Sequence, residues 1–107
     1  MVNETIYLGN YDNTIDVTVM ADGQPIDGSV VTRTLLRLTS SGGGAVDIDS
    51  TIATQAFNWE GGTLKMTLGD QAAITAGLWS ARLIVYDAGH PDGIVWDEPL
   101  RLTAVQI

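Results

Sequence analysis

Apolar and polar side chains alternate along most of this chain, with a period of two residues. Ile15, Val17 and Val19 share one side of their segment, and Asp16 and Thr18 lie on the other. This alternation is typical of a β-strand with one side buried and the other in water. We therefore predict strands wherever it recurs, which is in the segments 30–38, 57–59, 63–68, 74–87 and 94–105. Residues 48–53 remain open between a short edge strand and an irregular crossing.

Short clusters of turn-forming residues separate these segments. Glycine, proline and aspartate gather at residues 22–28, 40–44, 60–62, 69–70 and 88–93, where the chain is expected to reverse. Residues 71–74 are expected to form a single helical turn. About seven short strands without strand–helix–strand spacing predict an all-β fold. We expect one domain over residues 1–107, an immunoglobulin-like antiparallel β-sandwich.

Large aromatic side chains are expected to fill the space between two sheets. Phe57, Trp59 and Trp79 each alternate in step with the apolar side of a predicted strand. The last segment contains Pro99, which cannot donate a ladder hydrogen bond. That strand is therefore predicted to lie at an edge or to be kinked at a bulge.

Composition excludes several functional classes. The chain has 107 residues and no cysteine, so disulfides and thiolate chemistry are impossible. Thirteen acids against five Lys and Arg residues give a formal charge of −8, which disfavours nucleic acid and acidic membranes as partners. No apolar run approaches the ~18 residues of a membrane span. The first residues lack the build of a signal peptide, so we expect the chain to mature as translated in a cytoplasm.

Candidate catalytic residues are few. His90 is the only histidine, and it stands beside Pro91 in a predicted turn, where no rigid scaffold would hold it against a nucleophile. Several carboxylates are available, among them Asp47, Asp49, Asp97 and Glu98, but their pattern favours no pair. We therefore predict no catalytic residues and a protein that is not an enzyme.

Two acidic patterns raise the question of metal binding. Asp47 and Asp49 alternate as carboxylates often do in calcium loops, but the remaining ligands of an EF-hand are missing. Asp87, His90 and Asp92 could gather at one hairpin tip. Both patterns arise readily in an acidic chain, so we predict no metal ligands and no cofactor.

The pattern predicts two candidate partner-binding surfaces. Arg33, Leu35 and Arg37 share the polar side of one strand. The alternative for the two arginines is cross-strand pairing with the abundant acids. The second surface surrounds Tyr86, His90 and Trp96, where a ring directly after a turn would be half exposed. The outward Leu35 and an exposed Trp96 would favour self-association. The alternative function is a carbohydrate-binding sandwich, in which an exposed Trp96 would stack on a sugar and Asp47 and Asp49 would bind calcium.

The order of several segments resembles a known family. Residues 15–19 are followed by Asp22-Gly23-Gln24-Pro25, then by Ala76-Gly77-Leu78-Trp79, Tyr86-Asp87 and residues 92–96. This order is similar to the small immunoglobulin-like β-sandwich modules of tailed-phage virion proteins, including the N-terminal module of phage baseplate upper proteins. The resemblance spans residues 15–105.

The resemblance implies a non-enzymatic structural or accessory protein of the phage head, neck, tail or baseplate. Such a protein acts through contacts with copies of itself and with other virion proteins, in particles assembled in the host cytoplasm. Baseplate modules of that type continue into longer fibre or linker regions, whereas this sequence stops at Ile107. The expectation is therefore a free-standing virion component.

Overall fold

The computed structural model describes residues 2–21, 23–96 and 100–107. These residues form an all-β fold with a single 3-10 turn, η1, at Gly28–Val30. The strands are β1 Val2–Leu8, β2 Ile15–Thr18, β3 Met20–Ala21, β4 Gln24–Pro25, β5 Val31–Ser40, β6 Ala45–Asp49, β7 Phe57–Glu60, β8 Thr63–Met66, β9 Gly77–Asp87, β10 His90–Val95 and β11 Leu100–Gln106. Within the described ranges, no helix is long and apolar enough to span a bilayer.

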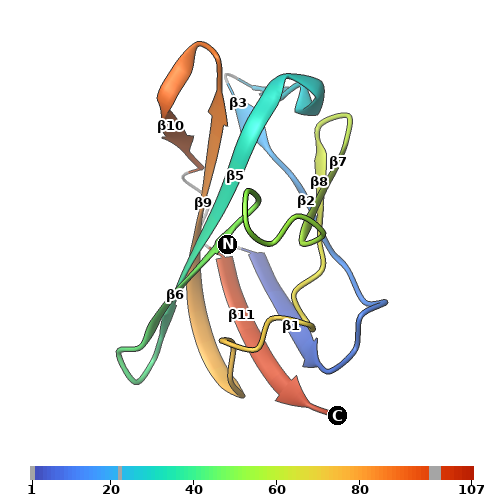
Figure 1. Cartoon of the computed structure of the whole chain (residues 1–107), viewed down its shortest axis with the longest axis vertical. Coiled ribbons are helices and arrows are strands. Elements are labelled where there is room, and N and C mark those ends of the chain that lie inside the picture. Colours follow the sequence, from blue (N-terminus) through green and yellow to red (C-terminus); the bar gives the residue numbers. More distant parts are fainter. Residues whose placement is uncertain (1, 22, 97–99) are drawn as a thin grey trace.

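Two sheets face each other as the layers of a sandwich (Figure 1). Sheet A has the strand order β1-β11-β9-β5-β6, and β10 also pairs with β9. Sheet B has the order β2-β8-β7, and a separate two-stranded ribbon joins β3 to β4. The predicted all-β sandwich is therefore present. It has more strands than the seven expected, because β1 and β4 were not predicted and the predicted segment 94–105 divides into β10 and β11.

One pair of strands departs from the predicted antiparallel pattern. The strand β1 was not among the predicted strands, and it runs parallel to β11, from Val2 beside Leu100 to Leu8 beside Gln106. The two arrows point the same way in Figure 1. Sheet A is consequently a mixed sheet, and the long strand β9 occupies its middle with β11 on one side and β5 on the other.

The turn predicted at residues 88–93 is present between β9 and β10, but it is shorter than expected. His90 already pairs with Asp87 in the ladder between β10 and β9. The polar residues that follow form an irregular stretch before Ile94, where Gly93 adopts a φ of 87° that favours glycine. Beyond β10, the Trp96 N–H donates to the Leu83 carbonyl. The predicted effect of Pro99 lies outside the described residues.

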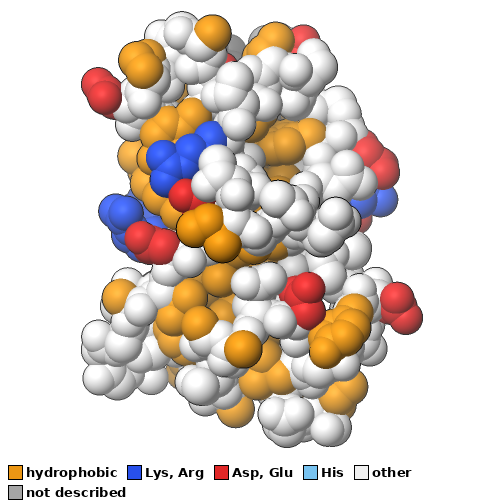
Figure 2. Space-filling view, viewed as in Figure 1, with side chains coloured by type: hydrophobic (Ala, Val, Ile, Leu, Met, Phe, Trp, Pro, Cys, Tyr) orange, Lys and Arg blue, Asp and Glu red, His pale blue; other side chains and the backbone are white. Residues whose placement is uncertain are grey.

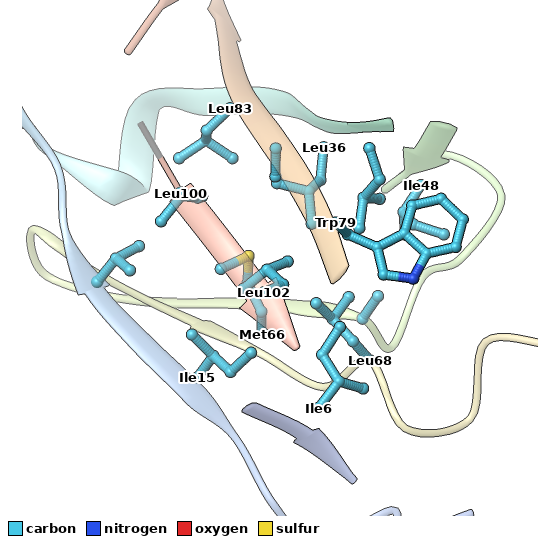
Figure 3. Close-up of a cluster of buried hydrophobic side chains, with 14 of the residues drawn as sticks. Ile6, Ile15, Leu36, Ile48, Met66, Leu68, Trp79, Leu83, Leu100 and Leu102 are labelled. Carbon is cyan, nitrogen blue, oxygen red and sulfur yellow. The ribbon is translucent and has the colours of Figure 1, made fainter. Parts of the chain in front are cut away.

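The core lies between the two sheets and confirms most of the predicted apolar stripes (Figure 3). Trp79 is 5% exposed, and its indole N–H donates to the Thr75 carbonyl at 2.8 Å. Phe57 and Trp59 are half-buried at the margin of the core. The core side chains that the alternation predicted are Ile15, Val17, Val19, Leu36, Leu38, Leu64, Met66, Leu68, Leu83, Leu100, Leu102 and Ala104.

Three local predictions change in the structure. Residues 71–74 form a turn instead of a helical turn, with the Ile74 N–H donating to the Gln71 carbonyl. Val30 belongs to η1 and is exposed, so the predicted strand begins one residue later, at Val31. Residues 48–53 contain parts of both alternatives. The edge strand β6 ends at Asp49, and a turn follows it.

Candidate functional site

The candidate site is the outer face of sheet A, the side that points away from sheet B. Its residues alternate along each strand with the core residues, and register brings β6, β5, β9 and β11 side by side. In Figure 2, blue and red side chains adjoin along the margin that β5 and β6 occupy in Figure 1. The charged members are Arg33, Arg37, Asp47, Asp49, Arg82 and Arg101.

At one end of this face, Arg33 is held by a carboxylate and an aromatic ring. Its Nε donates to Asp49 Oδ2 at 3.1 Å, and its Nη2 donates to the same oxygen. Its guanidinium carbon lies 4.7 Å from the centre of the Tyr86 ring, a cation–π distance. Hydrogen bonds from Arg33 and then from Thr51 lower the pKa of Asp49 to about 2. We call Arg33, Leu35, Asp49 and Tyr86 the Arg33 cluster.

The second predicted arginine is also paired, but in a more open setting. Arg37 Nε donates to Asp47 Oδ1 at 3.1 Å, and that hydrogen bond raises the pKa of Arg37. About half of each side chain is exposed, 55% for Arg37 and 50% for Asp47. The alternative of cross-strand pairing with acids is therefore confirmed for both arginines. An exposed pair of this kind contributes little to stability, because solvent screens it.

Leu35 is on the predicted side of the sheet, but its expected exposure is wrong. Its side chain is only 5% exposed although it is not part of the central core cluster. Across the ladders it lies between Ile84 on β9 and Asp49 on β6. Arg33 and Arg37 flank it along β5, and arginine stems readily cover apolar surface. Leu35 is therefore a buried packing residue of this face, and its side chain is not available to contact a partner.

Two further arginines belong to this face. Arg82 lies directly opposite Arg37 across the β5–β9 ladder, and Arg101 lies opposite Ser80 across the β9–β11 ladder. Both are exposed. They alternate with core residues along their own strands, and the adjacency of β5, β9 and β11 brings them beside Arg37. Four of the five cations of the chain therefore stand on one face.

A depression of about 360 Å³ opens between these arginines. We call it the arginine depression, and its lining residues are Arg37, Thr39, Ser80, Ala81, Arg82, Leu100 and Arg101. The hollow follows from side-chain size, because the short Ser80 stands between longer neighbours on both adjoining strands. Within the described part of the chain, no carboxylate forms an ion pair with Arg101.

The second predicted surface does not form one cluster. Tyr86 belongs to the Arg33 cluster, and His90 is at the exposed hairpin end, with Nδ1 2.8 Å from Asp87 Oδ1. That contact is the main cause of a lowered pKa of Asp87. The expected exposure of Trp96 is wrong, since its side chain is 9% exposed and joins the core. Its indole is therefore unavailable for stacking on a partner or a sugar.

The candidate calcium ligands have other partners. Asp47 and Asp49 each bind an arginine, and they lie in the ladder opposite Arg37 and Leu35. Over residues 2–21, 23–96 and 100–107, no group of three acidic or histidine side chains is arranged to hold a metal ion. The candidate carboxylates Asp97 and Glu98 lie outside the described residues.

Comparisons with known proteins add no relative to this description. No family model matches the chain, and no match was found among curated proteins or solved structures.

Proposed function

We propose that the chain is a non-enzymatic module that works through protein–protein contacts made by the outer face of sheet A. The observation that carries this proposal is the sidedness of its charge. Four of the five cations stand on one side of one sheet, in a chain with a formal charge of −8. A positive surface on an acidic molecule orients an approaching partner and selects against basic ones.

The strand order supports a finer assignment of the fold, to the immunoglobulin-like sandwiches. In such domains, the strands conventionally lettered B, E and D form one sheet, and G, F and C form the other. The variable type adds a strand beside C. Here β2-β8-β7 follows the order B-E-D, and β11-β9-β5-β6 follows the order G-F-C with the added strand. The assignment rests on this order, since the chain has no cysteine for an inter-sheet disulfide.

Within this class we favour the role that the resemblance implies, a structural or accessory component of a tailed-phage virion. The segment Ala76-Gly77-Leu78-Trp79 fits this proposal, because Gly77 opens β9 with a φ of 136° and Trp79 anchors the core two residues later. Virion proteins act by fitting against copies of themselves and against neighbouring proteins. A rigid sheet with one charged, uncovered face is suited to that task.

Carbohydrate binding receives less support from the geometry. Of the tryptophans considered as a sugar platform, Trp79 and Trp96 are buried. Trp59 is half-buried, and its indole N–H donates to Thr34 Oγ1 at 3.1 Å. The carboxylates proposed to hold calcium are engaged by Arg33 and Arg37. We therefore place the contacts of this module with protein and not with sugar.

Co-sedimentation with phage particles tests the proposal. The purified chain is added to tailed-phage particles whose own copy has been deleted, and the particles are separated on a density gradient. We expect the wild-type chain to band with the particles. Ser80→Tyr places a ring in the centre of the outer face of sheet A and should abolish this binding.

A matched variant on the other sheet provides the control. Thr18 is exposed in β2 on sheet B, so Thr18→Tyr adds the same ring away from the proposed face and should leave binding unchanged. Thermal unfolding of both variants checks that each is folded. Failure of the wild-type chain to band with particles contradicts the virion role, and equal binding by Ser80→Tyr and wild type contradicts the assigned face.

A further inference from the structure

Three arginines line the arginine depression, namely Arg37, Arg82 and Arg101. Arg37 and Arg82 lie directly opposite each other across the ladder, an arrangement of like charges that is destabilising by itself. Thirteen acids are available to five Lys and Arg residues, yet in the described ranges Arg101 has no ion-pair partner. An anion in this hollow would compensate the charge of Arg101 and would lie beside Arg37 and Arg82, which line the same depression.

The residues that line the depression can donate hydrogen bonds to a planar oxyanion. Thr39 and Ser80 lie opposite each other in neighbouring strands and supply hydroxyl groups beside the arginines. A guanidinium donates two parallel hydrogen bonds to a carboxylate, which fixes the direction as well as the charge of the bound group. The contact of Arg37 with Asp47 already uses this chemistry, and its open setting leaves that guanidinium half exposed.

The depression continues into a second hollow of about 530 Å³. The two share Thr39, Ser80 and Arg101. The second is lined both by polar residues, among them Asn3 and Thr103, and by apolar ones, among them Leu78, which is 61% exposed. Together they form one groove across β5, β9, β11 and β1. Hydroxyl and amide groups along such a groove match the alternating donors and acceptors of an extended polypeptide backbone.

We propose that this groove binds an acidic segment of a partner polypeptide, with carboxylates in the arginine depression and an apolar side chain against Leu78. The proposal rests on the proposed function, since it names the partner chemistry of the same face. Polypeptide is favoured over nucleic acid because the whole chain carries a charge of −8. That charge repels a long phosphate backbone outside the groove, whereas a short acidic segment stays within it, beside the arginines.

Fluorescence anisotropy with a labelled hexaglutamate peptide tests the site directly, with hexaglutamine as the neutral probe. We expect hexaglutamate to bind at low salt and hexaglutamine not to bind. Arg101→Gln should weaken hexaglutamate binding about tenfold, since a charge-assisted hydrogen-bonded contact is lost. Arg101→Lys should give an intermediate loss, because it keeps the charge without the paired donors.

Lys65→Gln is the matched control. Lys65 lies on β8 in sheet B, 3.5 Å from Glu60, and its replacement removes the same unit of charge. It should change hexaglutamate affinity less than twofold. Equal losses for Arg101→Gln and Lys65→Gln would overturn the site, because they would show general attraction to net charge. Tighter binding of an oligothymidylate than of hexaglutamate would overturn the choice of polypeptide.

The two proposals fail in distinguishable ways. If Ser80→Tyr abolishes particle binding but the wild-type chain does not bind hexaglutamate, the contact face holds and the carboxylate site is wrong. If hexaglutamate binds with the expected arginine dependence but the chain does not band with particles, the carboxylate site holds and the virion role is wrong.

Discussion

The two sides of sheet A are made by the same strands, but they are stabilised in different ways. On the inner side, Leu36, Leu38 and Leu83 are fully excluded from water by sheet B. On the outer side nothing in the described chain forms a second layer, yet Leu35 is only 5% exposed. Its neighbours are the stems and partners of charged residues. The difference teaches that a polar face can bury an apolar side chain when its long charged residues are themselves held in place.

The outer face is itself divided. In the Arg33 cluster, a carboxylate and an aromatic ring fix the guanidinium, and Asp49 is 15% exposed. In the arginine depression, the pair of Arg37 and Asp47 is open to solvent. One end of the face is therefore held more firmly by its own contacts, and the other end is more open to solvent.

The largest effect is expected on the inner side. Trp79→Ala should lower the free energy of unfolding by about 3–5 kcal/mol, because it removes a large core ring and leaves a cavity. Urea denaturation measures the change. Trp79→Phe keeps most of the ring and loses only the indole donor to the Thr75 carbonyl, so its loss should be clearly smaller. A fully stable alanine variant would contradict the core assignment of Trp79.

A smaller effect is expected for the buried leucine of the outer side. Leu35→Ala should lower the free energy of unfolding by about 2 kcal/mol, at the lower end for buried leucines, because arginine stems can partly close the gap. Leu78→Ala is the matched control on the same face, since Leu78 is 61% exposed. Chemical denaturation of both variants makes the comparison. Equal stability of the two would show that the outer face does not bury Leu35 in solution.

The smallest effect concerns the two aspartates and depends on pH. The pKa of Asp49 is about 2 in the folded chain against an ordinary 3.8, so the unfolded chain binds more protons between these values. The stabilisation by Asp49 is therefore fully present above pH 3.8 and is lost as the pH falls toward 2. Solvent screening limits its expected size to about 1 kcal/mol.

Asp49→Asn and Asp47→Asn separate the two ends of the face. At neutral pH the first variant should be less stable than wild type and should unfold with a flatter acid dependence. The second should behave as wild type, because its ion pair is open to solvent. Denaturant midpoints from pH 2 to 7 provide the measurement. An identical acid dependence for all three chains would remove the distinction between the two pairs.

Local alternation was sufficient to predict the sandwich and most of its core. Val17 and Leu64 lie on predicted inner sides, and they face each other across the β2–β8 ladder. Arg82 and Arg101 alternate with core residues along their strands, so the same pattern is consistent with their outward position. It did not show that they share a depression with Arg37, because that depends on which strands are neighbours, and alternation within one strand carries no such information.

Trp96 and Leu35 show two further limits of the pattern. The expected exposure of Trp96 assumed that its ring directly follows a turn. In the structure the strand β10 already begins at His90, and Trp96 comes after its end, where its N–H pairs with the Leu83 carbonyl and its side chain joins the core. Leu35 was placed on the correct side, but its burial depends on Ile84 across the ladder, which only the register reveals.

The parallel pairing of β1 with β11 has a consequence for folding kinetics. Val2 lies beside Leu100, so nearly the whole described chain separates the first residues of the two strands. Such a contact is among the most expensive in loop-closure entropy and forms late. During synthesis, β1 has no strand to pair with until β11 has left the ribosome. The edge of β9 that β11 will cover stays open over the same interval, and a chaperone or a second copy can pair with it there.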